Sequence, residues 1–240
     1  MKKLSATEQI LYMKKLADYL QIYGWGYSDN NIDLLLSTFL APIPTKDLPD
    51  ILKQIYAAFD MLEPEENCYL QFAKMVGERY GWDAHILEIG GGVFPAFAKY
   101  VDELQQEHGG KGTITTYDPW LVVDKLGNVK LHREAFSYSM PVDSFDLIVG
   151  IMPCKATETI IRKATLSHKE FFLAMCGCIH YELIRDPSGC MMMSRLTYEN
   201  YKREVYALAK KQEADGFEVR EEYAKQYSFK YPIISSRVVK

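Results

Sequence analysis

The sequence predicts an α/β fold with a doubly wound, mostly parallel sheet, an N-terminal helical cap and a C-terminal antiparallel β-hairpin. From residue 84 onward, short apolar runs alternate with stretches of helical periodicity, which is typical of a parallel sheet covered by helices. Residues 1–83 show helical spacing and no strand-like alternation. Residues 217–223 and 233–239 are two β-prone runs joined by a polar loop. We therefore expect a helical cap over 1–83 and a sheet domain over 84–240.

Within the sheet domain, the apolar runs and their breaks predict the elements in order. Strands are expected at 85–89, 113–117, 129–132, 145–151 and 171–178, and helices at 95–108, 157–168 and 198–214. Gly216 follows the last helix as a stop signal. In the cap, the spacing predicts a helix over 48–61 and another over 65–80.

Composition narrows the class of protein. The chain has 240 residues, 48% of them apolar, and a net charge of −4, which gives no general attraction to nucleic acid or to an anionic membrane. From the charge we expect no nucleic-acid partner. We also expect no membrane association, because no apolar run is long enough to span a bilayer. Five scattered cysteines without a basic, apolar leader favour a cytoplasmic protein with free thiols. The sequence leaves the oligomeric state open.

An aromatic cluster surrounds two glycines in the cap. Tyr23, Trp25 and Tyr27 alternate with Gly24 and Gly26. One interpretation is a flap over a substrate, because glycines beside aromatic side chains suit a moving lid. The other is ordinary packing between helices. We carry the three aromatic residues forward as candidate substrate contacts.

The strongest local pattern is a glycine turn after the first strand. Gly90, Gly91 and Gly92 follow a buried apolar run and precede a helix that begins near Pro95. The amides at such a helix start suit a ligand. A dinucleotide fingerprint needs a third glycine where Pro95 stands, which disfavours a nicotinamide or flavin cofactor. The alternative is a tight strand-to-helix turn without a ligand.

Glu88, two residues before Gly90, completes an acidic-x-Gly-x-Gly pattern. This pattern resembles the first motif of the class I S-adenosylmethionine-dependent methyltransferases. The resemblance implies S-adenosyl-L-methionine as the cofactor, with its methionine part passing over the turn. It further implies a set of cofactor-binding residues at this motif, namely Glu88, Gly90, Gly91, Gly92 and Phe94.

A second motif ends the second strand. Asp118 follows the run 113–117, and an acidic residue at that point accepts hydrogen bonds from ribose hydroxyls in doubly wound folds. Pro119 comes next and is included with Asp118 among the cofactor contacts. The alternative interpretation is that Asp118 and Pro119 only start a turn.

A third stretch carries most of the resemblance. Glu134, Ala135 and Phe136, followed by the Pro-x-x-Ser-Phe-Asp pattern of 141–146, are similar to a recurring methyltransferase pattern. The resemblance implies that Glu134 or the main chain at Ala135 meets the adenine amino edge, with Phe136 against the ring. An adenine site needs polar partners at that edge and an apolar wall.

The loop after the fourth strand is expected to border the acceptor substrate, because ligands bind at the carboxyl ends of such strands. Its residues are Gly150, assigned to the cofactor, and Met152, Pro153 and Cys154, assigned to the substrate. Only Pro153 agrees with the pattern of amino-group methyltransferases, so an amine acceptor is not implied. Cys154 is either a nucleophile near a helix start or an inert buried thiol.

Cys176, Cys178, His180 and Cys190 are possible zinc ligands by type, but their spacing matches no standard zinc site. We expect no metal. His180 follows the fifth strand and is the candidate general base, although a lone histidine is more often structural.

The sequence thus predicts a cytoplasmic S-adenosylmethionine-dependent methyltransferase that acts on a small molecule. One alternative is an aminopropyl or aminocarboxypropyl transferase that uses a related nucleoside. In such enzymes an acidic residue often follows the triple glycine, whereas Val93 stands here. Another alternative is a non-catalytic protein that binds S-adenosylmethionine or a nucleotide.

Overall fold

The computed structural model describes Gln54 and residues 57–58, 60, 62–153, 156–175, 180–185, 191–196, 198–224 and 232–239. Several sequence-based candidates lie outside these residues, namely Tyr23, Trp25, Tyr27, Cys154, Cys176, Cys178 and Cys190. The aromatic flap, the reactive thiol and the complete set of zinc ligands therefore stay predictions. Among the described residues, no group of three or more His, Cys, Asp or Glu side chains is placed to hold a metal ion.

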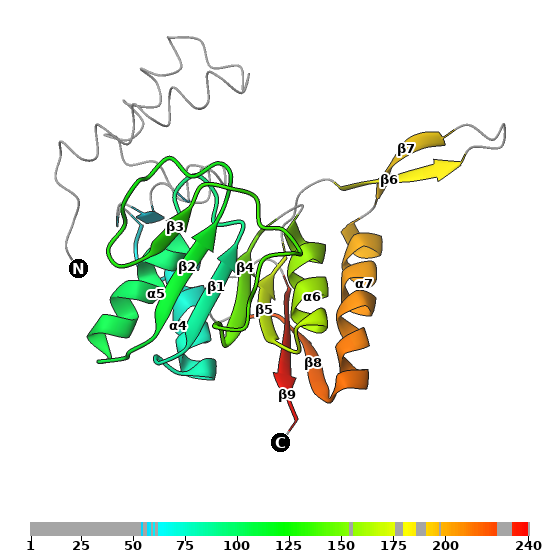
Figure 1. The fold of residues 1–240 in the computed structure, drawn as a ribbon. Coiled ribbons are helices and arrows are strands. Elements are labelled where there is room, and N and C mark those ends of the chain that lie inside the picture. Colours follow the sequence, from blue (N-terminus) through cyan, green and yellow to red (C-terminus); the bar gives the residue numbers. More distant parts are fainter. Residues whose placement is uncertain are drawn as a thin grey trace, which may run out of the picture. The chain divides into compact units, whose positions relative to one another are not determined.

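Seven strands form one sheet in the order β3-β2-β1-β4-β5-β9-β8 (Figure 1). The pairs β2–β3, β1–β4 and β4–β5 are parallel, and β9 is antiparallel to both β5 and β8. This order confirms the predicted doubly wound, mostly parallel fold and the C-terminal hairpin. The bounds are β1 His85–Ile89, β2 Thr113–Tyr117, β3 Lys130–His132, β4 Leu147–Ile151, β5 Glu170–Ala174, β8 Phe217–Glu222 and β9 Ile233–Val238.

Contacts divide the chain into two compact units. The first comprises Met1–Asp83 and Gly91–Ala135, and the second Ala84–Gly90 and Phe136–Lys240. The sequence-based division into a cap over 1–83 and a sheet domain over 84–240 stays a prediction, because most of the first 61 residues lie outside the described part.

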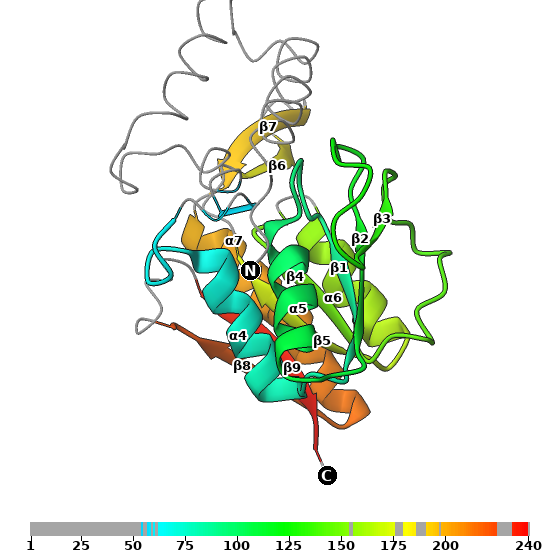
Figure 2. The ribbon, with the colours of Figure 1, turned by 90° about the vertical axis from the view of Figure 1, so that its left-hand side faces the viewer.

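In the first unit, helix α4 (Cys68–Tyr80) packs along helix α5 (Ala96–Glu107), as Figure 2 shows. The rings of Phe72 and Phe97 meet edge to face, with centroids 5.3 Å apart. Helix α4 begins later than predicted because the Asn67 side chain caps it by accepting a hydrogen bond from the Leu70 amide at 3.1 Å. Helix α5 also packs on β2, so the chain after the glycine turn is fixed on two sides.

In the second unit, helix α6 (Thr157–Leu166) packs on β4 and β5 and lies beside helix α7 (Tyr198–Ala209) (Figure 1). Helix α7 continues into the 3-10 helix η3 (Lys210–Asp215), which Gly216 ends in the left-handed conformation. The side chains of β4 are all buried, which explains its continuous apolar sequence.

A second sheet of two antiparallel strands, β6 (His180–Arg185) and β7 (Met191–Leu196), precedes α7. The sequence analysis did not predict it. Among the described residues, β6 and β7 pair only with each other, so neither strand needs the continuous apolar sequence of a strand inside a large sheet. Their sequences therefore gave no clear strand signal.

Candidate cofactor site

The glycine turn between β1 and α5 requires glycine at two of its positions. Gly90 and Gly92 have φ angles of 82° and 73°, a region that other residues rarely adopt. A Cβ atom at Gly92 would lie 2.5 Å from Nε2 of Gln54 and 2.7 Å from its Oε1. The turn is therefore shaped both by its backbone conformation and by a side chain that lies against it.

Asp118 connects the turn to the end of β2. Its Oδ2 accepts a hydrogen bond from the Gly92 amide at 2.8 Å, and its Oδ1 accepts one from the Trp120 amide at 2.7 Å. Two motifs that are 26 residues apart in the sequence thus meet in the structure, although their predicted contacts with a cofactor stay predictions. The main chain on either side is joined as well, because the Val122 amide donates to the Val93 carbonyl at 3.1 Å.

The carboxyl group of Asp118 lies in an environment that excludes water. The residue is only 6% exposed. Burial raises the pKa of Asp118 above its ordinary value, while the hydrogen bonds from Trp120 and Gly92 act in the opposite direction. An ionised carboxylate has about four lone-pair sites, and the two amides use one on each oxygen. The chemistry of this group therefore suits a ligand that presents two neighbouring hydroxyls.

Two residues at this site were missed by the sequence analysis. Nε2 of the half-buried Gln54 donates to the Gly91 carbonyl at 2.8 Å. Gln54 carried no signal, because a glutamine within a helical run is ordinary. Trp120 is 42% exposed, and its position directly after Asp118 and Pro119 was a signal that could have been used. An exposed aromatic ring beside a buried carboxylate offers an apolar wall for a planar ligand.

The predicted adenine residues lie on an exposed loop after β3. Glu134 and Ala135 are exposed, and Phe136 is half-buried. Oε1 of Glu134 lies 3.7 Å from Nδ1 of His132, whose ring stacks on Tyr117 with centroids 4.3 Å apart. The loop therefore begins next to the stacked rings of His132 and Tyr117, and the Glu134 carboxylate lies toward them.

Two further predicted cofactor contacts, Phe94 after the glycine turn and Pro119 after Asp118, differ in exposure. The Phe94 side chain is buried, with 2% exposure, and its carbonyl accepts a hydrogen bond from the Ala96 amide at 2.7 Å. Pro119 is exposed. Any contribution of Phe94 to ligand binding would therefore come through the main chain rather than through its ring.

In the second unit, the ends of β1 and β4 lie close together. Glu88 is fully buried in β1 and pairs with Val149 of β4. A Cβ atom at Gly90 would lie 3.0 Å from Cβ of Pro153. The structure therefore brings together Gly90 and Pro153, which the sequence assigned to the cofactor and to the acceptor.

Gly150 and Met152 shape the end of β4. A Cβ atom at Gly150 would lie 2.4 Å from Cδ1 of Ile160. Met152 has a φ of 52°, which is uncommon for a residue with a side chain, and its amide donates to the Ala174 carbonyl at 2.8 Å. His180 is the first residue of β6 and pairs with Leu196, so the candidate base belongs to the two-stranded sheet.

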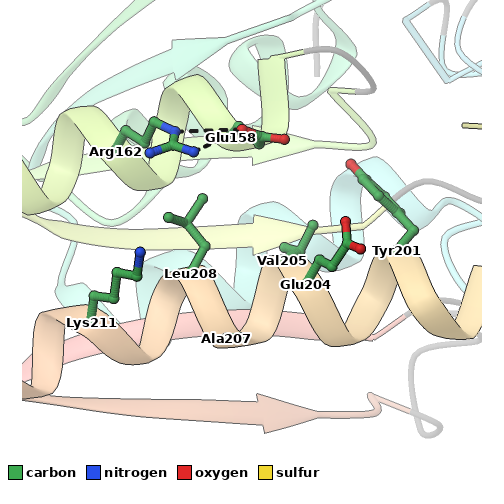
Figure 3. A pocket seen from close by; sticks show the side chains of 8 residues that line it. All are labelled: Glu158, Arg162, Tyr201, Glu204, Val205, Ala207, Leu208 and Lys211. Atoms are coloured by element: carbon green, nitrogen blue, oxygen red, sulfur yellow. Dashed lines mark hydrogen bonds and ion pairs between the residues drawn. The ribbon is translucent and has the colours of Figure 1, made fainter. Parts of the chain in front are cut away.

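A cavity of about 300 Å³ lies between α6 and the helical segment formed by α7 and η3 (Figure 3). Val205, Ala207 and Leu208 give it an apolar part, and α6 contributes the ion pair of Arg162 with Glu158. None of the predicted cofactor or substrate residues lines it. The lining residues are Glu158, Arg162, Tyr201, Glu204, Val205, Ala207, Leu208 and Lys211.

Comparison with known proteins gives similarity in structure only. No protein-family model and no curated protein matches the chain. A sugar N-methyltransferase from Streptoalloteichus is 12% identical, with a TM-score of 0.44, over 83% of this chain and 97% of that chain. A 1,6-didemethyltoxoflavin-N1-methyltransferase from Burkholderia thailandensis, crystallised with S-adenosylhomocysteine, is 12% identical, with a TM-score of 0.41, over 83% and 93%.

A precorrin-6y C5,15-methyltransferase from Geobacter metallireducens is 16% identical, with a TM-score of 0.40, over 65% of this chain and 80% of that chain. At these identities and TM-scores, the similarities do not establish an activity. The site is therefore defined by the strand order of the sheet and by two hydrogen bonds. These bonds join the glycine turn to Gln54 and to Asp118.

Proposed function

We propose that this protein is an S-adenosylmethionine-dependent methyltransferase that acts on a small-molecule acceptor. One observation carries the proposal: the Asp118 carboxylate is buried and accepts a hydrogen bond from the amide of Gly92 in the glycine turn. A carboxylate of this kind at the end of the second strand suits the ribose hydroxyls of a nucleoside ligand. The sequence motifs that resemble class I methyltransferases select S-adenosylmethionine among such ligands.

In this proposal the residues of the chain bind and orient the cofactor. Asp118 accepts hydrogen bonds from the ribose hydroxyls, and its two backbone partners fix the direction of its oxygens. The exposed ring of Trp120 and the loop at Glu134 and Ala135 provide an apolar wall and polar groups for an adenine base. When bound, S-adenosylmethionine supplies a methyl group on a sulfonium centre. The chain then has mainly to align the two reactants.

The acceptor side rests on the sequence motifs alone. We propose that Met152, Pro153 and Cys154 border the acceptor, and that His180 removes a proton where the acceptor has one to lose. Glu88, Gly90, Gly150 and Phe136 keep their proposed cofactor roles, and Tyr23, Trp25 and Tyr27 their proposed substrate role. A cytoplasmic location is also a proposal. It is supported by the scattered cysteines, and the described residues contain no helix that is long and apolar enough to cross a membrane.

Calorimetric titration with S-adenosylhomocysteine tests the proposal. Wild-type protein should bind saturably, and Asp118→Ala should weaken the affinity by about tenfold or more, because hydrogen bonds to a charged group are lost. Asp118→Asn keeps the side-chain size and should also bind weakly. Asp215→Ala is the matched control, since Asp215 is exposed and lies outside every motif assigned to the cofactor or the acceptor. Absence of binding by folded wild-type protein would falsify the assignment.

A further inference from the structure

Gln54 lies directly on the glycine turn. Its Nε2 donates to the Gly91 carbonyl, and the same carboxamide occupies the space that a side chain at Gly92 would need. The Gly92 amide in turn bonds to Asp118. The turn is therefore held between a neutral carboxamide and a buried carboxylate, which come from parts of the chain on opposite sides of it in the sequence.

A cluster of polar side chains holds Ala57 and Asp60 on α5. The Tyr100 hydroxyl contacts the Ala57 carbonyl and lies 2.9 Å from Oδ1 of Asp60. Asp60 also forms an ion pair with Lys99 at 2.7 Å, and Asn67 donates to the Tyr100 hydroxyl at 2.8 Å. Tyr100 is 1% exposed.

Ala57 and Ala58, three and four residues after Gln54, are buried at 0% and 4% exposure. Gln54 is itself half-buried and bonded to the Gly91 carbonyl, and Ala57 and Asp60 are held on α5, so Gln54 is a pre-positioned side chain rather than a loose one on the surface.

We propose that Gln54 binds the amino-acid end of the cofactor over the glycine turn. A carboxamide has two N–H donors and an acceptor oxygen, and the bond to Gly91 uses one of the donors. The second N–H suits a carboxylate and the oxygen suits an ammonium group, which are the two groups of a free amino acid. This inference rests on the proposed function, because it assigns one end of the same ligand whose ribose is assigned to Asp118.

Two ligands separate this role from a purely structural one. S-Adenosylhomocysteine carries the amino-acid end, and 5′-methylthioadenosine has the same nucleoside and a thioether without it. Gln54→Ala should weaken S-adenosylhomocysteine binding by about tenfold, the size expected for a hydrogen bond to a charged group. Its affinity for methylthioadenosine should stay within about twofold of wild type, the scatter expected for a group that makes no contact.

Gln54→Glu should weaken S-adenosylhomocysteine further, because a carboxylate then faces the ligand carboxylate. Gln106→Ala removes an exposed carboxamide from α5 and should change neither affinity. Thermal unfolding of each variant checks that the fold is kept.

Each remaining outcome counts against the inference. An equal loss of both ligands in Gln54→Ala shows that Gln54 only shapes the turn, and no loss shows that it does not contact the ligand. In both cases wild-type binding of S-adenosylhomocysteine leaves the proposed function in place. If wild-type protein binds neither ligand, the proposed function and the inference fail together.

Discussion

Gly92 combines a left-handed backbone with a close neighbour, so its replacement tests two effects. Its φ is 73°, and an added Cβ would meet the Gln54 carboxamide at 2.5 Å. Gly109 has a similar φ of 68° and nothing within 4 Å of an added Cβ. Gly109→Ala should therefore cost about 1–2 kcal/mol of unfolding free energy from the backbone alone. Gly92→Ala should cost more, because the carboxamide must also move.

Urea unfolding of the two variants measures the difference. The excess cost of Gly92→Ala should disappear in a Gln54→Ala background, since the clash partner is then gone. Equal costs for Gly92→Ala and Gly109→Ala in the wild-type background would contradict the observed position of the carboxamide.

At the scale of elements, β4 and α6 approach so closely at Gly150 that a side chain added there would have to displace Ile160. The added Cβ would lie 2.4 Å from Cδ1 of Ile160 and 2.9 Å from Cγ of Pro153. Gly150→Ala should lower the free energy of unfolding by about 1–3 kcal/mol, the usual cost of overpacking a core. Ile160→Val removes Cδ1, so the double variant should lose less than the sum of the two single losses. Strict additivity in chemical denaturation would argue against this packing.

At the scale of the whole molecule, stability should differ among the strands. All five residues of β4 are buried, as are four of the five in β5, whereas the residues of β3 are exposed or half-buried and β3 is at the end of the sheet. Amide hydrogen exchange should therefore be slowest in β4 and β5 and fastest in β3. Saturating S-adenosylhomocysteine should slow the Gly92 and Trp120 amides, which bond to Asp118. Unchanged exchange of both amides on binding would place the ligand elsewhere.

Local signals explain what could be predicted from the sequence. The apolar run gave β1 with its observed bounds, because burial on both faces leaves a clear pattern. β2 also has its predicted bounds and consists of β-branched and aromatic residues, and the C-terminal hairpin is within one residue of the prediction. The sequence assigned the glycine turn and Asp118 to one cofactor site without predicting a direct bond between them, and the structure shows that bond.

Contacts between distant residues explain most of what could not be predicted. Gln54 reaches a carbonyl 37 residues away, and nothing in its own surroundings indicates this. The strand expected to begin at Phe145 begins instead at Leu147. Just before it, Asp146 bonds twice to His85: its amide donates to the His85 carbonyl at 2.8 Å, and its carboxylate accepts from the His85 amide at 2.8 Å. Gly150 was assigned to a cofactor, yet packing against Ile160 by itself accounts for a glycine at that position.

The position of β9 affects how the nascent chain completes its sheet. β9 is the last described strand in the chain, yet it lies between β5 and β8. Until residues 233–238 leave the ribosome, β5 has an unpaired edge, and β8 has no partner through which to join the sheet. β5 is almost entirely apolar and buried in the finished protein, so a stalled chain would expose an aggregation-prone strand edge. We therefore expect the unfinished chain to depend on chaperones until its last strand is inserted.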